Sequence, residues 1–110
     1  MENIRFEFNS YALMPVSYHD LDEVISYLAI HPGVSVRLSG HTDDLGSEEF
    51  NRSLSANRAK SAAAYLISKG IAENRISAVG YGESKPLVNE TTEQARAINR
   101  RVEIEFYRQE

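Results

Sequence analysis

Apolar residues recur along this chain in two alternating spacings, and the alternation limits the folds that the chain can adopt. Four short segments, 4–8, 34–38, 76–79 and 102–106, place apolar side chains at about every second position, as half-buried strands do. The segments between them use the three-to-four spacing of a helix with one apolar face. The sequence therefore predicts the order β-α-β-α-β-α-β.

Capping residues predict where the helices begin. Asp20 with Glu23, and Thr91 with Gln94, have the spacing of capping boxes for the first and third helices. Glycine, serine and two glutamates in succession predict a second helix over 47–69, because the positive end of the helix dipole favours acidic side chains in the first turn.

Length and composition fit one globular domain. The 110 residues are 42% hydrophobic and 25% charged, and a chain of this length buries enough surface to fold without the disulfides that its lack of cysteine excludes. We expect a single domain over residues 1–110 of the α+β class. In this two-layer sandwich a four-stranded mixed sheet carries two or three helices on one face.

Charge and hydropathy exclude several partners. The formal net charge of -4 gives no general positive field to attract nucleic acid or an anionic membrane. No segment approaches the roughly 20 apolar residues of a membrane span, and Met1 is followed by a polar, strand-like stretch instead of a signal segment. These features predict a cytosolic protein or a domain excised from a larger one.

The expected helix 47–69 carries a basic and an amide side chain on its apolar face. On a wheel of about 100° per residue with Phe50 at zero, Leu54 lies near ~40° in the apolar arc. Arg58, near ~80°, and Asn51, near ~100°, lie in the same arc. A guanidinium cannot lose its charge, so its burial requires an anion or several carbonyl groups held against it.

The nearest candidates for that anion are Asp43 and Asp44, in the loop where a βα unit usually presents its ligand site. One interpretation is a buried structural ion pair between Asp43 and Arg58. The other is a partly solvated acid and base, with the Thr42 hydroxyl and the Asn51 amide beside them. That arrangement would complement a zwitterion, with its ammonium at the aspartate and its carboxylate at the arginine. The residue pattern leaves both open.

A series of motifs follows in a fixed order along the chain. They are Gly40-His41-Thr42-Asp43-Asp44-Leu45-Gly46, Asn51, Leu54-Ser55, Arg58-Ala59, Tyr65-Leu66, Gly80-Tyr81-Gly82, Pro86 and Asn99-Arg100-Arg101-Val102-Glu103. Together they resemble the OmpA-like peptidoglycan-binding domain, and the similarity extends from Phe6 to Phe106. The peptidoglycan-associated lipoprotein and the stator protein of the flagellar motor carry the same module.

The resemblance implies non-covalent binding of the peptidoglycan stem peptide, which anchors the outer membrane or an envelope complex to the cell wall. It implies that Asp43 binds the ammonium of meso-diaminopimelate and that Arg58 binds its carboxylate. No enzyme activity, cofactor or metal is expected. Glu7 stands where the family has a shorter aspartate, so no role is assigned to it. The expected ligand-binding residues are Asp43, Arg58, Thr42, Asn51, Asn9 and Arg100.

This ligand implies a location in the periplasm. The domain would be attached to the outer membrane or, alternatively, tethered to the inner membrane as in a motor stator, by an anchor outside this chain. Met1 would then be a domain start within a larger envelope protein. A protein-interaction module of the envelope without wall binding is the alternative function.

A catalytic or phosphate site in the same loop is a weaker interpretation. His41 with the two aspartates could ligate a metal or act as a base with its orienting acid, but two carboxylates alone do not define a hydrolase. Gly40 and Gly46 suggest a phosphate loop, yet the aspartates would repel phosphate and a Walker lysine is missing.

Arg100 and Arg101 could form a basic patch. Neighbouring residues of a strand point to opposite faces, so one of them could help to line a groove beside Asn51 and Arg58 while the other is solvated. We favour a structural or rim role for both.

Overall fold

A computed structural model describes residues 3–108. It contains four strands and three α-helices in the predicted order. The elements are β1 (Ile4–Arg5), α1 (Pro15–Ile30), β2 (Val34–Gly40), α2 (Glu48–Ser68), a short 3-10 helix (Glu73–Arg75), β3 (Ile76–Gly80), α3 (Glu93–Asn99) and β4 (Arg101–Arg108). The expected domain start at Met1 lies outside the described residues.

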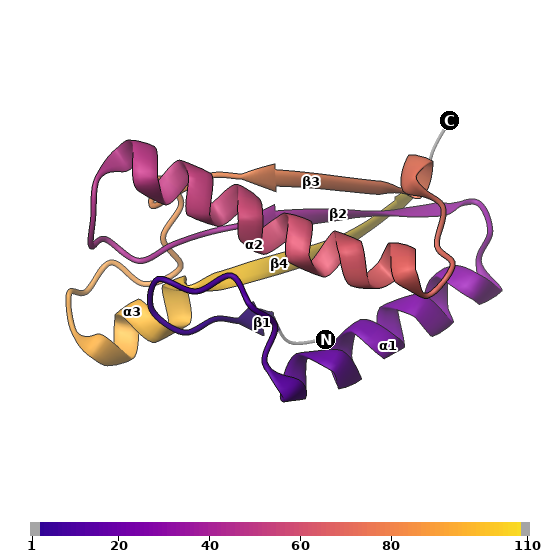
Figure 1. The fold of residues 1–110 in the computed structure, drawn as a ribbon, viewed down its shortest axis with the longest axis horizontal. Coiled ribbons are helices and arrows are strands. Elements are labelled where there is room, and N and C mark those ends of the chain that lie inside the picture. Colours follow the sequence, from indigo (N-terminus) through magenta and orange to yellow (C-terminus); the bar gives the residue numbers. More distant parts are fainter. Residues whose placement is uncertain (1–2, 109–110) are drawn as a thin grey trace.

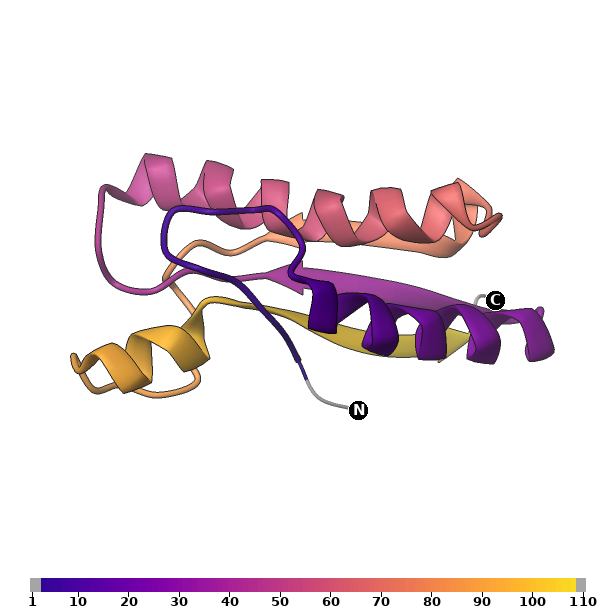
Figure 2. The same cartoon turned by 60° about the horizontal axis from the view of Figure 1, so that its bottom comes forward.

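The strands form one mixed sheet in the order β1-β4-β2-β3. β2 pairs in parallel with β3 and antiparallel with β4, and the short β1 adds to the outer edge of β4. α1 and α2 cover one face of the sheet, and α3 lies beyond the end of the sheet where β4 begins (Figures 1 and 2). The predicted α+β sandwich is confirmed.

The core lies between the sheet and the two long helices. Alternate residues of β2 point into it, and the antiparallel register places Ile104 beside Leu38 and Phe106 beside Val36. On the opposite face of the sheet, Arg37 pairs with Glu105. One sheet face is therefore apolar and covered, while the other is polar, as the strand alternation predicts.

α2 is buried along one face, and this face contains the predicted positions Leu54, Arg58 and Asn51. All buried positions of the helix are Asn51, Leu54, Ser55, Arg58, Ala59, Ala62, Ala63 and Leu66. Phe50, the zero of the wheel, lies outside this face and is 49% exposed. The polar members of the arc, Asn51 and Arg58, lie inside the protein as expected.

Two glycines let α2 approach the sheet closely. A Cβ on Gly40 would lie 1.9 Å from the carbonyl oxygen of Ser55, and one on Gly80 would lie 2.4 Å from the backbone nitrogen of Ala56. The Ser55 hydroxyl accepts a hydrogen bond from the Gly82 N–H over 2.8 Å. This contact fixes the first half of α2 over the carboxyl ends of β2 and β3, where the candidate site begins.

The predicted strand over residues 4–8 is wrong beyond Arg5. Phe6 remains buried, but Phe8 is 50% exposed, and Asn9 has a φ of 55°, in the left-handed region. The chain leaves the sheet here because the backbone of residues 7–10 turns toward the side chain of Arg58. A local alternation of apolar residues did not reveal this long-range partner.

Both predicted capping boxes are also misplaced. α1 begins at Pro15, whose missing N–H suits the first turn, so Asp20 lies inside the helix. α3 is capped by Thr92, whose hydroxyl accepts from the Ala95 N–H over 3.2 Å, one residue after the predicted Thr91. By contrast, Ser47 caps α2 as the sequence predicted. Within residues 3–108, no helix is both long enough and apolar enough to cross a membrane.

Candidate functional site

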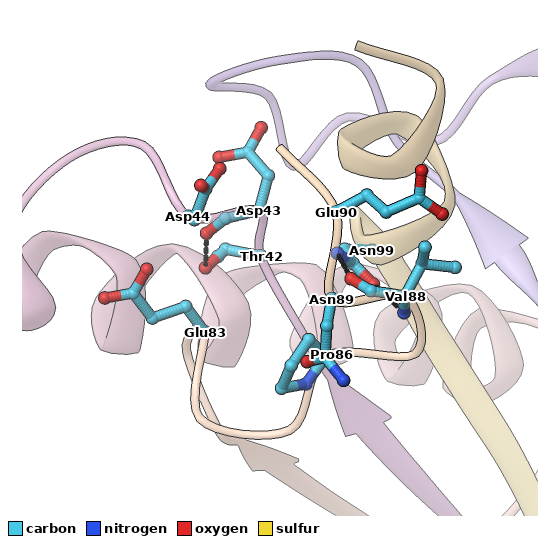
Figure 3. A pocket seen from close by; sticks show the side chains of 9 residues that line it. All are labelled: Thr42, Asp43, Asp44, Glu83, Pro86, Val88, Asn89, Glu90 and Asn99. Atoms are coloured by element: carbon cyan, nitrogen blue, oxygen red, sulfur yellow. Dashed lines mark hydrogen bonds between the residues drawn. The ribbon is translucent and has the colours of Figure 1, made fainter. Parts of the chain in front are cut away.

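A pocket of about 170 Å³ opens where the loop after β2, the segment before α3 and the end of α3 meet. Figure 3 shows three carboxylates on one side of it, with Asn99 and the 86–90 segment on the other. We refer to it as the acidic pocket. Its lining residues are Thr42, Asp43, Asp44, Glu83, Pro86, Val88, Asn89, Glu90 and Asn99.

Asp43 is the most buried carboxylate of the acidic pocket, with 3% of its surface exposed. Its Oδ1 accepts a hydrogen bond from the Leu45 N–H over 3.0 Å, and its Oδ2 accepts from Arg100 over 3.2 Å. The Asp43 side chain therefore has a fixed orientation, with its charge balanced by the guanidinium of Arg100.

Arg100 connects three parts of the structure. Besides Asp43, its guanidinium donates to the carbonyl oxygen of Phe6 and to Glu93 in α3, both over 3.0 Å. Only 5% of the residue is exposed, so it is suited to positioning Asp43 more than to contacting a ligand directly.

A second ion pair joins α3 to the same loop. Arg96 donates to Asp44 over 2.8 Å, and this hydrogen bond lowers the pKa of the Asp44 carboxyl below its ordinary value. Asp44 is more open to solvent than Asp43, since 44% of its side chain is exposed. The acidic pocket also contains Glu83 and Glu90, so its wall has more carboxylates than the two arginines balance. Such a wall favours a cationic ligand group.

Arg58 is completely buried, and both sequence-based interpretations of its partner are wrong. Its Nε donates to the Ser10 carbonyl over 2.8 Å, and its two terminal nitrogens donate to the carbonyls of His41 and Glu7, each over 2.9 Å. Within the described part of the chain it forms no ion pair with Asp43, and neither side chain is partly solvated. Backbone carbonyls accept the hydrogen bonds of the guanidinium. Carbonyl groups are the alternative to an anion that burial of a guanidinium allows.

Among residues 3–108, the charge of Arg58 has no anionic hydrogen-bond partner. Burial lowers the pKa of Arg58 to about 10, and the nearby charge of Asp43 opposes that effect. The three carbonyl dipoles lower the free-energy cost of burying the Arg58 charge, but they do not neutralise it.

The remaining predicted site residues occupy different positions. Thr42 lines the acidic pocket and donates its hydroxyl to the Asp43 carbonyl over 2.9 Å (Figure 3). Asn51 is 1% exposed, buried as its place in the apolar arc predicts, and its amide donates to the Leu45 carbonyl over 3.0 Å. Asn9 is exposed on the 7–10 turn, beside the carbonyls that hold Arg58.

Neither arginine of the Arg100-Arg101 pair is in solvent, so the alternative with one solvated arginine is wrong, while the structural role favoured for both agrees with their burial. Arg101 is 2% exposed, and its guanidinium donates to the carbonyls of Asn99 and Lys85 and to Glu103. The Lys85 carbonyl comes from the segment between β3 and α3, and local alternation in a strand could not indicate such a partner.

His41 is also buried, and the structure does not support its use as a metal ligand. Its Nε2 lies 3.5 Å from Glu103, and neither ring nitrogen has a hydrogen-bond partner among the described residues. The ring stacks on Tyr81, with 5.5 Å between the centroids. Burial and the charge of Arg101 lower the pKa of His41 to about 4. Within residues 3–108, no group of three or more potential ligands could hold a metal ion.

Sequence reasoning missed Arg96, Glu83, Glu90 and the role of Asn99. The Asn99 side chain accepts from the Leu87 and Val88 N–H groups and donates to the Val88 carbonyl, so it shapes the pocket wall. Asn99 could have been identified from the sequence, because it belongs to the Asn99-Arg100-Arg101 motif. No local signal connects the other three to Asp43.

The profile of the OmpA family matches residues 5–100, most of the chain. The chain belongs to the OmpA family. This OmpA-family chain is 41% identical to outer membrane porin F of Pseudomonas fluorescens and 42% identical to the peptidoglycan-binding protein ArfA of Mycobacterium bovis, each over 92% of its length. It spans 31% of each of those relatives, about a third of their length.

Solved structures of the family have the same fold. The peptidoglycan-associated lipoprotein of Burkholderia pseudomallei superposes with a TM-score of 0.94 at 28% identity, covering 97% of this chain and 91% of the lipoprotein chain. The C-terminal domain of Helicobacter pylori MotB superposes with a TM-score of 0.90 at 27% identity, covering 99% and 86%. The likeness therefore includes the elements that build the acidic pocket.

Proposed function

We propose that this OmpA-family chain binds peptidoglycan through the stem peptide and serves as a non-covalent anchor to the cell wall. Two relatives whose names refer to peptidoglycan, ArfA and the peptidoglycan-associated lipoprotein, support this assignment. The observation that carries it is the placement of Asp43 in an acidic pocket, close enough to Arg58 for their charges to interact. Opposite charges at Asp43 and Arg58 would complement a zwitterionic group that reaches both side chains.

We assign the two charges to the two ends of a diaminopimelate side chain. Its ammonium enters the acidic pocket, where Asp43 accepts from it and the other carboxylates add a favourable field. Its carboxylate is directed to Arg58, whose hydrogen-bond partners in the described part of the chain are backbone carbonyls. Thr42 lines the acidic pocket, and Asn9 lies on the 7–10 turn whose carbonyls hold Arg58. Asn51 and Arg100 hold the loop and Asp43 in place.

We propose that this domain lies in the periplasm. Relatives include outer membrane porins and a MotB domain, which correspond to anchoring at the outer membrane and, alternatively, at the inner membrane. The domain assigned to residues 1–110 is then the wall-binding part of a larger envelope protein.

Co-sedimentation with purified cell-wall sacculi tests the function. We expect the wild-type chain to sediment with sacculi and Asp43→Asn to lose most of that binding. Loss of one charged hydrogen bond weakens binding roughly ten-fold to one-hundred-fold. Glu90→Gln, an exposed change in the same pocket wall, should weaken binding by a smaller factor and leave folding intact.

Glu105→Gln is the matched control, because it removes the same charge from the polar sheet face, where Glu105 pairs with Arg37. It should bind sacculi like the wild type. Equal binding by the wild type, Asp43→Asn and Glu90→Gln would contradict the assignment of the ligand to the acidic pocket. Absence of sedimentation by the folded wild-type chain would favour a protein-interaction module instead.

Calorimetry with stem peptides tests the ligand. Peptides with lysine or ornithine keep the ammonium but lack the carboxylate that we direct to Arg58. They should bind roughly ten-fold to one-hundred-fold more weakly than the diaminopimelate peptide. Equal affinities for the diaminopimelate, lysine and ornithine peptides would show that Arg58 does not bind this carboxylate.

A further inference from the structure

The turn between β1 and α1 holds the guanidinium of Arg58 with its backbone. The carbonyls of Glu7 and Ser10 accept two of the three hydrogen bonds from this side chain, over 2.9 and 2.8 Å. In Figures 1 and 2 the chain between β1 and α1 runs alongside α2, which carries Arg58. We refer to residues 7–10 as the clasp.

The two clasp carbonyls accept hydrogen bonds from Arg58 that a carboxylate is also able to accept. A guanidinium hydrogen bond to a carboxylate is shorter and about twice as strong as one between neutral groups. The two clasp carbonyls satisfy the N–H donors of Arg58 but supply only dipoles to a fully buried charge. The third acceptor, the carbonyl of His41, differs because it lies directly after β2, and the His41 N–H is itself bonded to the carbonyl of Arg101.

Among residues 3–108, the other hydrogen bonds of the clasp are local, such as the one from the Ala12 N–H to the Ser10 hydroxyl oxygen over 3.1 Å. Asn9, at its tip, has a φ of 55°, a conformation that costs free energy for any residue with a Cβ. The neighbouring aromatic side chains do not anchor it, since Phe8 is 50% and Tyr11 53% exposed. Within the clasp, one hydrogen bond closes the turn, from the Ser10 N–H to the Glu7 carbonyl over 3.2 Å. The Arg58 guanidinium is therefore a main attachment of the clasp to the rest of the protein.

We propose that the clasp determines ligand specificity: a ligand carboxylate displaces the carbonyls of Glu7 and Ser10 from Arg58, whereas a neutral group does not. A carboxylate gains charged hydrogen bonds in the exchange. A carboxamide only replaces one neutral acceptor by another, so it does not open the clasp. This inference rests on the proposed function and adds to it the element that distinguishes free from amidated stem peptides.

Nuclear magnetic resonance of the wild-type chain tests the exchange directly. With a diaminopimelate peptide carrying a free side-chain carboxylate, the Arg58 Nε–H and the Glu7 and Ser10 carbonyl carbons should shift. The His41 carbonyl should shift much less. With the amidated peptide these clasp signals should stay near their ligand-free positions, and affinity should fall roughly ten-fold or more.

Arg75 is the internal control. Its guanidinium is also held by backbone carbonyls, those of Leu28, His31 and Val34, at the opposite end of the sheet from the acidic pocket. Its Nε–H signal should not respond to either peptide. Tight binding of the free-acid peptide without any shift at Arg58, Glu7 and Ser10 would overturn the clasp while leaving the proposed function intact. Failure of both peptides to bind would overturn the proposed function and the clasp with it.

A pair of variants tests the conformational part of the inference. Asn9→Gly and Asn9→Ala both remove the amide, but glycine adopts a positive φ without strain and alanine does not. The closed clasp should therefore be more stable in Asn9→Gly than in Asn9→Ala. The free-acid peptide should bind Asn9→Gly roughly five-fold more weakly than Asn9→Ala. Equal affinities, or tighter binding by Asn9→Gly, would contradict displacement of the clasp.

Discussion

Arg100 Nη1 donates a hydrogen bond to Asp43 Oδ2 over 3.2 Å, and the two side chains are only 6% and 3% exposed. The pair joins the residue between α3 and β4 to the loop after β2, two points far apart in the sequence. A buried ion pair of this kind contributes little as a pair, but removing one partner leaves an uncompensated charge in the interior.

Arg100→Ala should therefore destabilise the domain by about 3 to 5 kcal/mol, measured by urea denaturation. Arg96→Ala is the matched control, since it breaks the ion pair with the much more exposed Asp44. That variant should lose no more than about 1 kcal/mol. Similar losses of stability in the two variants would mean that breaking the buried pair costs no more than breaking the exposed one.

Arg58→Ala should also destabilise the domain, by about 2 to 4 kcal/mol, because three carbonyls lose their donor and a large buried side chain leaves a void. Lys60→Ala, an exposed change on the same helix, should lie within about 0.5 kcal/mol of the wild type. Chemical denaturation of the two variants measures both effects. An Arg58→Ala variant as stable as the wild type would show that water molecules replace the guanidinium as hydrogen-bond donors to the three carbonyls.

Gly40→Ala should be poorly tolerated, because the added Cβ would lie 1.9 Å from the Ser55 carbonyl oxygen and force α2 away from β2. We expect a loss of about 3 kcal/mol in thermal unfolding. Gly33→Ala provides the comparison, since its Cβ would meet only the end of the Arg108 side chain, at 3.8 Å. A mild effect of Gly40→Ala would show that α2 shifts freely over the sheet.

His41 should make stability depend on pH. Because its pKa is about 4 in the folded domain and about 6.5 in an unfolded chain, the unfolded state binds more protons between these values. Stability should therefore fall as the pH drops from about 6.5 to about 4, by up to roughly 3 kcal/mol from this group, with no further contribution below that range. Denaturation at pH 7 and pH 5 should show a smaller pH effect in His41→Gln than in the wild type. His19→Gln, whose side chain is 79% exposed, should retain the wild-type pH effect.

The order of the elements could be predicted from the sequence because it depends on local spacing. The alternation in β2 and β4 and the apolar arc of α2 come from residues within one or two turns of each other. The burial of Arg58 followed from the same local argument, since its position on the helix is independent of its partner.

The partners of the charged residues could not be predicted in this way. Helix spacing placed Arg58 in the core and suggested Asp43, but Arg58 is held by carbonyls of the 7–10 turn and Asp43 by Arg100. The same cause shortened β1, because the turn toward Arg58 ended a strand whose apolar alternation continues to Phe8.

The sequence by itself determined the strands and helices, the burial of Arg58 and Asn51, and the likeness to the OmpA family. Only the tertiary structure decided which groups meet at the acidic pocket. The sheet order β1-β4-β2-β3 places the beginning of β4 between the end of β1 and the end of β2. Arg100 therefore reaches both Phe6 and Asp43, residues that are 94 and 57 positions away. Local periodicity carries no information about such pairs, because their separation along the chain has no fixed relation to their distance in space.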